Sequence, residues 1–149
     1  MSHETNSELD QANLRIVVAA IAIVYIGALG FLPGQSVDTY LPVILYIVAF
    51  LLVSIALRQV IARWPGHYPA RRIFGMIHDY TGTSFGLVVG GEPALPLYAV
   101  MVWVNLGNGM RYGSRYLAIA TGLALLALLI VYRLTPPVSY THLRAHETK

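Results

Sequence analysis

The sequence has no cysteine, a single lysine and few charged residues of either sign. The absence of cysteine excludes disulfides, thiolate catalysis and cysteine-ligated metal sites. Only 11% of the 149 residues are charged and 56% are hydrophobic, whereas soluble domains usually carry about 25% charged residues. The chain is therefore too apolar to have the water-exposed surface of an ordinary soluble domain. The formal net charge of +3 is small, and no basic run points to a nucleic-acid partner.

Long apolar segments are what the chain has in abundance. A helix needs about 20 apolar residues to cross a hydrocarbon core about 30 Å thick, and about 17 to 25 are tolerated. Five segments meet or approach that length. The fold class predicted from them is all-α, a polytopic helical membrane bundle. The expected spans are at about residues 14–32, 40–61, 73–90, 95–109 and 115–133.

Arginines occur in alternate loops between these spans. The loops after the second and fourth spans hold Arg58, Arg63, Arg71, Arg72, Arg111 and Arg115. The other two loops hold Asp38 and Glu92 and no basic residue. Cytoplasmic loops accumulate Lys and Arg, so the N-terminus is predicted to be cytoplasmic, with residues 1–13 as a polar tail. This tail lacks the basic start and cleavage site of a signal peptide.

The C-terminal residues differ from the rest of the chain. Residues 135–149 include VSYTHLRAHETK, which brings the lysine and two of the five histidines and shows no apolar periodicity. This segment resembles a translated sequencing adapter, and we expect it to be non-native. Five spans from a cytoplasmic start would leave Leu134 outside. A sixth span is therefore expected to follow in the intact protein.

The third predicted span combines glycines with an acidic residue. Gly82, Gly86 and Gly90 repeat every four residues, which places them on one helical face where small residues let a neighbouring backbone approach. Asp79 lies seven residues past Arg72, which is about 10 Å deeper along a helix. A carboxylate there costs about 3 kcal/mol unless it is paired.

Three arginines are candidate partners for this acid, because long side chains can reach down from the cytoplasmic side. They are Arg72, Arg111 and Arg115. A structural ion pair and a signal-coupling or ligand role are both open for Asp79, and Thr83 shares its helical stripe. No nucleophile–base pair, phosphate loop or metal cluster stands out. We therefore predict no catalytic centre and no metal site.

Residues 97–117, LYAVMVWVNLGNGMRYGSRYL, form a second dense group of polar residues and glycines. The fourth span is expected to break near Gly107–Gly109 and to reverse direction there, with asparagine amides satisfying the freed backbone. These residue types fit two roles. They could form a purely structural helix–loop–helix connection between the fourth and fifth spans, or a junction that relays motion to the cytoplasm. The signal-coupling or ligand candidates are Asp79, Thr83, Gly82, Gly86, Gly90, Glu92, Tyr98, Trp103, Asn105, Asn108, Arg111 and Arg115, with Arg72 as a possible ion-pair partner.

Taken in order, these residues resemble the N-terminal membrane region of bacterial hybrid sensor histidine kinases, the family that includes the diffusible-signal-factor sensors. The resemblance covers about residues 14–134, and its specific part is residues 71–117. The matching positions are Arg71, Arg72, Gly75, Met76, Asp79, Tyr80, Gly91 to Ala94, Pro96 to Tyr98, Trp103, Val104, Gly107 to Gly109 and Arg111 to Gly113.

The resemblance implies an input domain over residues 14–134, in the bacterial inner membrane, that senses a signal such as a cis-2-unsaturated fatty acid. It implies a homodimer that relays this signal to a cytoplasmic kinase core using ATP and Mg²⁺, and on to a response regulator in a quorum-sensing phosphorelay. This chain has no phosphoacceptor or ATP-binding motif and needs no cofactor of its own. It departs from the family by stopping before the kinase core. It cannot phosphorylate anything by itself, although the intact parent would be a histidine kinase.

Two rival interpretations stay open at this point. The same input module could be fused to another output, such as a nucleotide cyclase. Alternatively, the chain could be a stand-alone small membrane scaffold or transport protein. Secondary transporters commonly show repeated halves with broken helices, and no such internal repeat is evident here.

Overall fold

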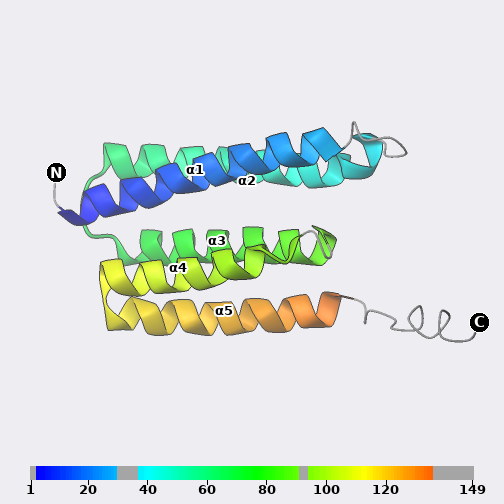
Figure 1. Ribbon diagram of the computed structural model, residues 1–149. Coiled ribbons are helices and arrows are strands. Elements are labelled where there is room, and N and C mark those ends of the chain that lie inside the picture. Colours follow the sequence, from blue (N-terminus) through cyan, green and yellow to red (C-terminus); the bar gives the residue numbers. More distant parts are fainter. Residues whose placement is uncertain (1–2, 30–36, 91–93, 136–149) are drawn as a thin grey trace, which may run out of the picture.

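The structure is a computed structural model that describes residues 3–29, 37–90 and 94–135. These residues form five antiparallel helices, so the predicted all-helical class is confirmed for them (Figure 1). The helices are α1 (His3–Leu29), α2 (Val37–Arg63), α3 (Pro69–Gly90), α4 (Leu97–Tyr112) and α5 (Ser114–Leu134). Because each helix reverses the direction of the one before it, six arginines gather at one end of the bundle. We call this the basic end, and its arginines are Arg58, Arg63, Arg71, Arg72, Arg111 and Arg115.

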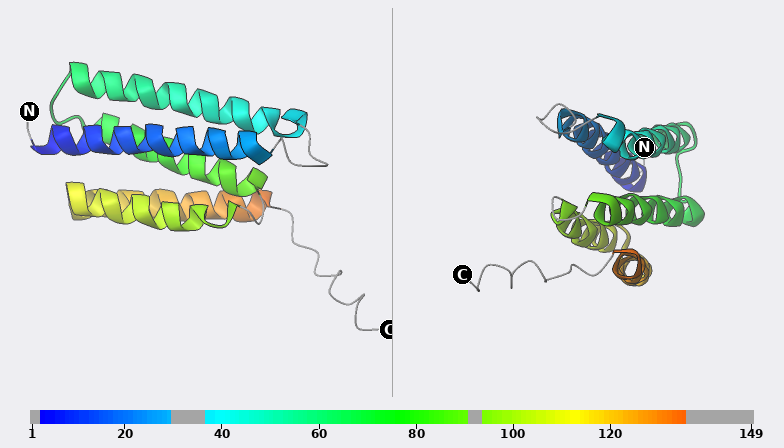
Figure 2. Two further views of the ribbon diagram at one scale, coloured as in Figure 1. Left: turned by 45° about the horizontal axis from the view of Figure 1, so that its top comes forward. Right: turned by 90° about the vertical axis from the view of Figure 1, so that its right-hand side faces the viewer.

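The helices lie in two layers. α1 and α2 pack together as a hairpin, and α3, α4 and α5 form a three-helix unit beside it (Figure 2). The larger core lies inside the three-helix unit, where buried residues from all three helices meet: Met76, Tyr80, Leu87, Met101, Ala120, Ala127 and Val131. A smaller cluster of Ala12, Leu57 and Ile61 joins the two helices of the hairpin.

Three of the five helices are long and apolar enough to cross a membrane. The qualifying stretches are Asn6–Ala28, Tyr40–Arg63 and Ser114–Leu134. Large apolar side chains on these helices are widely exposed: Ile21 and Leu52 are each 62% exposed and Leu125 is 63% exposed. α4 has 16 residues, about 24 Å at the helical rise, and α3 carries charged residues in its first half. Five spans therefore stay a prediction.

α1 begins at His3, so most of the polar tail is helical and continues directly into the apolar stretch. One expectation about a helix end is corrected. α4 does not break at Gly107–Gly109 but runs on to Tyr112. A glycine inside a helix costs only about 1 kcal/mol relative to alanine, which is too little to end it. The chain reverses instead at Gly113, whose φ of +87° favours glycine.

Candidate functional site

Two charged residues and two alanines of α1 form one buried stripe that starts at the basic end. Glu8, Ala12, Arg15 and Ala19 are all buried, and their spacing of four, three and four residues places them on one helical face. This face looks toward α3, on which Arg72 and Asp79 are also buried. The first helix therefore meets α3 through charged side chains of this face, Glu8 and Arg15.

The guanidinium of Arg15 forms a bidentate ion pair with the carboxylate of Asp79. Its Nε donates to Oδ1, and its Nη2 donates to Oδ2 at 2.8 Å. The Gln11 amide also donates to Oδ2 at 3.3 Å. Gly75 makes room for the pair, because a Cβ built there would lie 2.9 Å from Arg15 Nη2. The carboxylate that would be costly alone is thus paired.

The partner of Asp79 differs from the one expected. Arg72 was predicted as its possible partner, but the Nε of Arg72 donates to Glu8 at 2.6 Å. Arg111 and Arg115 are exposed, and neither forms an ion pair with any side chain that the structure describes. The reason is geometric: Arg15 approaches from the facing helix at the depth of Asp79, whereas the expected partners start from the end of the bundle.

Glu8 is the second anion of the site. It accepts from Arg71 Nε at 2.9 Å and Nη2 at 2.5 Å, in addition to its bond from Arg72. Arg71 also donates to the backbone carbonyls of Trp64 and Gly66, at 2.8 and 2.9 Å, in the connection between α2 and α3. We call the five residues Glu8, Arg15, Arg71, Arg72 and Asp79 the ionic clasp.

Aromatic residues of α4 and α5 extend the clasp to the rest of the bundle. The guanidinium of Arg72 lies 4.4 Å from the ring centroid of Tyr112 and 5.5 Å from that of Tyr116. The Tyr112 hydroxyl donates to Gln11 at 3.4 Å. The first helix is thereby tied to α3 and α4.

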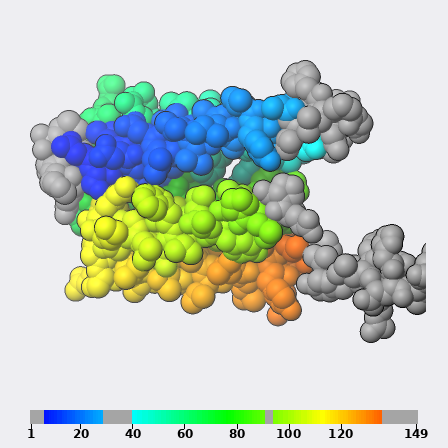
Figure 3. Space-filling model, in the orientation of Figure 1, coloured from blue at the N-terminus to red at the C-terminus, as the bar shows by residue number. Residues whose placement is uncertain are grey.

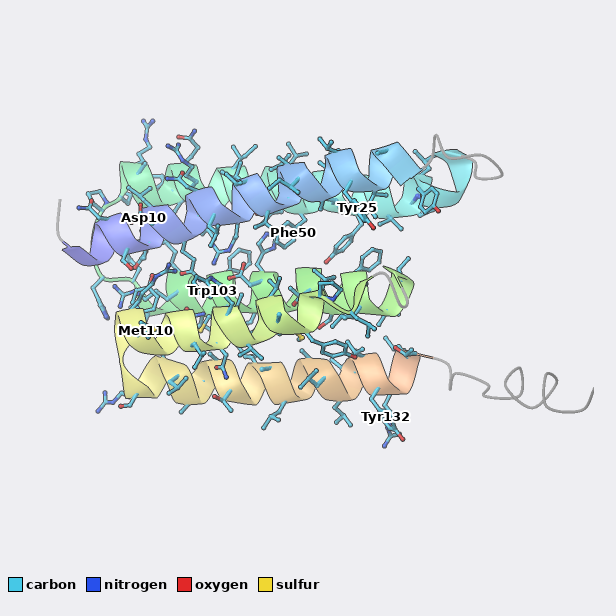
Figure 4. All side chains as sticks on the ribbon, viewed as in Figure 1. Asp10, Tyr25, Phe50, Trp103, Met110 and Tyr132 are labelled. Atoms are coloured by element: carbon cyan, nitrogen blue, oxygen red, sulfur yellow. The ribbon has the colours of Figure 1, made fainter. Side chains whose placement is uncertain are left out.

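A separate contact joins α2 to α3 farther along the bundle. The hydroxyl of Ser54 lies 3.0 Å from His78 Nε2, and the Phe50 ring stacks on the His78 ring with 3.9 Å between centroids. Figure 4 shows Phe50 pointing from α2 into the space between the layers. Tyr46 and Phe85 stack at 3.7 Å farther on. Aromatic side chains therefore hold the two layers where the ionic clasp does not reach.

The glycines of α3 meet side chains of different elements. A Cβ at Gly82 would lie 2.5 Å from the Phe50 ring, one at Gly86 would lie 2.5 Å from Leu97, and one at Gly90 would lie 2.6 Å from Ala94. The three glycines therefore do not line one single helix–helix contact. An i, i+4 stripe drifts around the helix by about 40° each step, because 3.6 residues make a turn.

The other candidate residues do not gather into one site. Thr83 donates to the backbone carbonyl of Asp79 at 3.0 Å. Asn108 is buried and donates to Val104 O at 2.7 Å within its own helix, so its amide satisfies no broken backbone. Asn105 lies 3.2 Å from the Thr121 hydroxyl on α5.

Two aromatic candidates lie on the surface, and one acid cannot be placed. Tyr98 and Trp103 are 40% and 63% exposed. Glu92 lies outside the described residues. Within the described part of the chain, no group of three or more His, Cys, Asp or Glu side chains could hold a metal ion.

Sequence reasoning missed three members of this region: Glu8, Gln11 and Arg15. The signal that could have found them is their spacing of three and four residues, which continues the helical periodicity of the first span into the polar tail. Such a continuation predicts one long helix with a polar buried face.

Comparison with known proteins adds a direct relationship. The chain is 39% identical over 136 residues to the sensory/regulatory protein RpfC of Xanthomonas campestris pv. campestris, with the same figures for strains ATCC 33913 and 8004. The chain is similar to RpfC over most of its length. The matched region is 91% of this chain but 18% of RpfC, so the chain spans about a fifth of that relative. No protein-family model and no solved structure matches the chain.

The resemblance predicted from the sequence is therefore confirmed. The three long apolar helices fit an N-terminal membrane sensor region of a hybrid kinase. The similarity to RpfC supports a sensory input role in a two-component system, and together with the apolar helices it indicates a protein of the inner membrane.

Proposed function

We propose that this chain is the membrane input module of a hybrid sensor histidine kinase and that the ionic clasp couples its two layers. The observation that carries the proposal is the similarity to a sensory/regulatory protein over 91% of the chain. The clasp supplies a physical means of coupling, because it joins α1 to α3 through buried charges. Removing one partner of a buried charge pair is costly, because the other charge is left without a counterion.

In this proposal α3 and α4 also cross the membrane, which gives five spans with the N-terminus in the cytoplasm. Two features support this placement. Both helices lie alongside α1, α2 and α5 (Figure 1), and six arginines occupy a single end of the bundle. Cytoplasmic segments accumulate arginine, so the basic end faces the cytoplasm.

The signal is an amphiphile of the fatty-acid type, such as a cis-2-unsaturated fatty acid, that reaches the module through the bilayer. A shallow apolar hollow lined by Ala20, Ile21, Val24 and Tyr25 runs along the second half of α1. Figure 3 shows the second half of α1 at the surface of the bundle, in lighter blue. An acyl chain has the chemistry to fill such a hollow. The intact protein would act as a homodimer, with ATP and Mg²⁺ in a kinase core that phosphorylates a response regulator.

A chimera tests the proposal. Residues 1–134 replace the matching segment of RpfC, and the purified chimera is reconstituted in proteoliposomes. Autophosphorylation is then measured with a cis-2-unsaturated fatty acid and with its saturated counterpart. We expect the cis acid to change the rate and the saturated acid to leave it unchanged. An inserted chimera whose rate is identical to that of RpfC lacking the segment, under every condition, would show that residues 1–134 provide no input.

A variant at Gly86 tests whether the α3–α4 contact carries the response. Gly86→Leu places a side chain where a Cβ alone would already lie 2.5 Å from Leu97. It should abolish the response while the chimera still inserts. Gly122→Ala is the matched control, because a Cβ at Gly122 meets nothing within 4 Å. Unchanged signalling in Gly86→Leu would exclude this contact from the coupling path.

A further inference from the structure

The arginines of the basic end divide into two groups by their contacts. Arg71 and Arg72 belong to the ionic clasp, and Arg58 donates to the Asn13 side chain at 2.7 Å. Arg63, Arg111 and Arg115 are exposed, and no ion pair joins them to any described side chain. Since the inward group already secures the helices, the outward group is available for a partner outside the chain.

Each outward arginine continues an exposed apolar stripe on its own helix. Arg111 lies two helical turns after Trp103, which is 63% exposed, and Arg115 lies one turn before Ile119, which is 38% exposed. Arg63 follows Val60 by three residues, and Val60 is 39% exposed. Residues three or four apart share a helical face, and residues eight apart still lie within one stripe about 100° wide. The cations therefore lie at the ends of faces that point away from the interior of the bundle.

Further exposed residues beside these arginines have the composition of a membrane interface. Met110, adjacent to Arg111, is the most exposed large apolar residue in the described part of the chain, at 88%, and Figure 4 shows it at the basic end of α4. Trp64, adjacent to Arg63, and Tyr68 are also exposed. Aromatic rings with an apolar body and a polar edge gather at the level of lipid headgroups. Exposed apolar faces that end in aromatics and arginines fit a lipid surface better than a soluble acidic protein.

We propose that Arg63, Arg111 and Arg115 bind the phosphate groups of anionic phospholipids in the leaflet at the basic end. The guanidinium group suits this role because it donates to phosphate oxygens through a planar fork of N–H groups. The proposal rests on the membrane placement of the proposed function but not on its signalling. Each cation near an anionic surface strengthens binding by about fivefold, so the three together should give a preference of about a hundredfold.

Selective lipid retention tests this proposal. The full chain is purified in mixed micelles with equal amounts of phosphatidylglycerol and phosphatidylcholine, and retained lipids are counted by native mass spectrometry. The triple variant Arg63→Gln, Arg111→Gln and Arg115→Gln should lose the preference for phosphatidylglycerol. The matched control is Arg133→Gln, at the opposite end of α5, which should keep it. Equal retention of the two lipids by the unmodified chain, or an unchanged preference in the triple variant, overturns the proposal.

A second measurement covers the case in which the triple variant fails to fold. The chain has two tryptophans, so Trp103→Phe leaves Trp64 as a reporter at the basic end. Brominated phosphatidylglycerol should quench Trp64 more than brominated phosphatidylcholine, and added salt should reduce the difference. Equal quenching overturns the proposal. If the chain prefers phosphatidylglycerol but the chimera does not respond to the fatty acid, the input role is refuted and the lipid site stands. If the chimera responds but the chain shows no lipid preference, the lipid site is refuted and the input role stands.

Discussion

The pair of Arg15 with Asp79 makes the sharpest prediction about stability. The two side chains are 8% and 7% exposed, so each charge depends on the other for compensation. Removing one partner of a buried ion pair costs about 3–5 kcal/mol, because the remaining charge stays buried without a counterion. Arg15→Gln and Asp79→Asn should therefore each destabilise the bundle by about 3 kcal/mol.

The double variant should cost much less than the sum of the single variants. With both charges gone, two neutral amides replace the pair, and no uncompensated charge is left. The expected cost is about that of one single variant, which gives an interaction energy of about 3 kcal/mol in the double-mutant cycle. Equilibrium unfolding of the four proteins in mixed micelles, followed by far-ultraviolet circular dichroism, measures each step of the cycle.

A second cycle serves as the control. Asp79→Asn combined with Arg111→Gln should be additive within about 0.5 kcal/mol, because Arg111 is exposed and forms no ion pair with a described side chain. Additivity in the Arg15 cycle would refute the buried pair. Coupling to Arg111 in place of Arg15 would restore a partner expected from the sequence and show that α1 lies elsewhere.

Three further changes probe the rest of the structure by the same unfolding assay. Glu8→Gln should cost about 3 kcal/mol because it leaves two buried arginines uncompensated, whereas the exposed Asp10→Asn should change stability by less than about 0.5 kcal/mol. Gly82→Ala should destabilise the bundle by about 1–3 kcal/mol, because the new methyl group clashes with the phenylalanine ring of α2. Its control, Gly122→Ala, lies in open space and should stabilise the bundle by up to about 1 kcal/mol. Equal effects of the two substitutions would argue against the close contact between Gly82 and this ring. Gly113→Ala should cost about 1 kcal/mol or more because its φ is positive, and a neutral result would mean that α4 and α5 are joined in another way.

The helices could be predicted from the sequence because apolar run length is a local property. The predicted spans at residues 40–61 and 115–133 agree closely with α2 (Val37–Arg63) and α5 (Ser114–Leu134). The sequence predicts the turn between α4 and α5 too early, at Gly107–Gly109, because glycine composition alone does not show which glycine ends a helix. Of the glycines between Gly107 and Gly113, only Gly113 has a positive φ, and positive φ is not visible in a sequence.

The partner of Asp79 could not be predicted, because it depends on which helices face each other. Arg15 lies 64 residues before Asp79, and from the sequence it looked like a residue at the edge of a span. Proximity in the chain favoured Arg72, which Glu8 engages instead. Long-range pairing is set by the packing of whole helices, so the need of Asp79 for a cation was predictable while the identity of that cation was not.

The way α1 meets α3 indicates where a signal can act on this bundle. α1 packs closely along α2, but it reaches α3 mainly through long charged side chains and not through close backbone packing. A closely packed interface resists small displacements because every shift opens voids or creates overlaps. A contact made by a few ion pairs has discrete bonded and separated arrangements, and switching transitions commonly use such contacts. Movement between the layers should therefore concentrate at the ionic clasp, which makes Glu8 and Asp79 the positions where neutralisation would change the response of the intact sensor most.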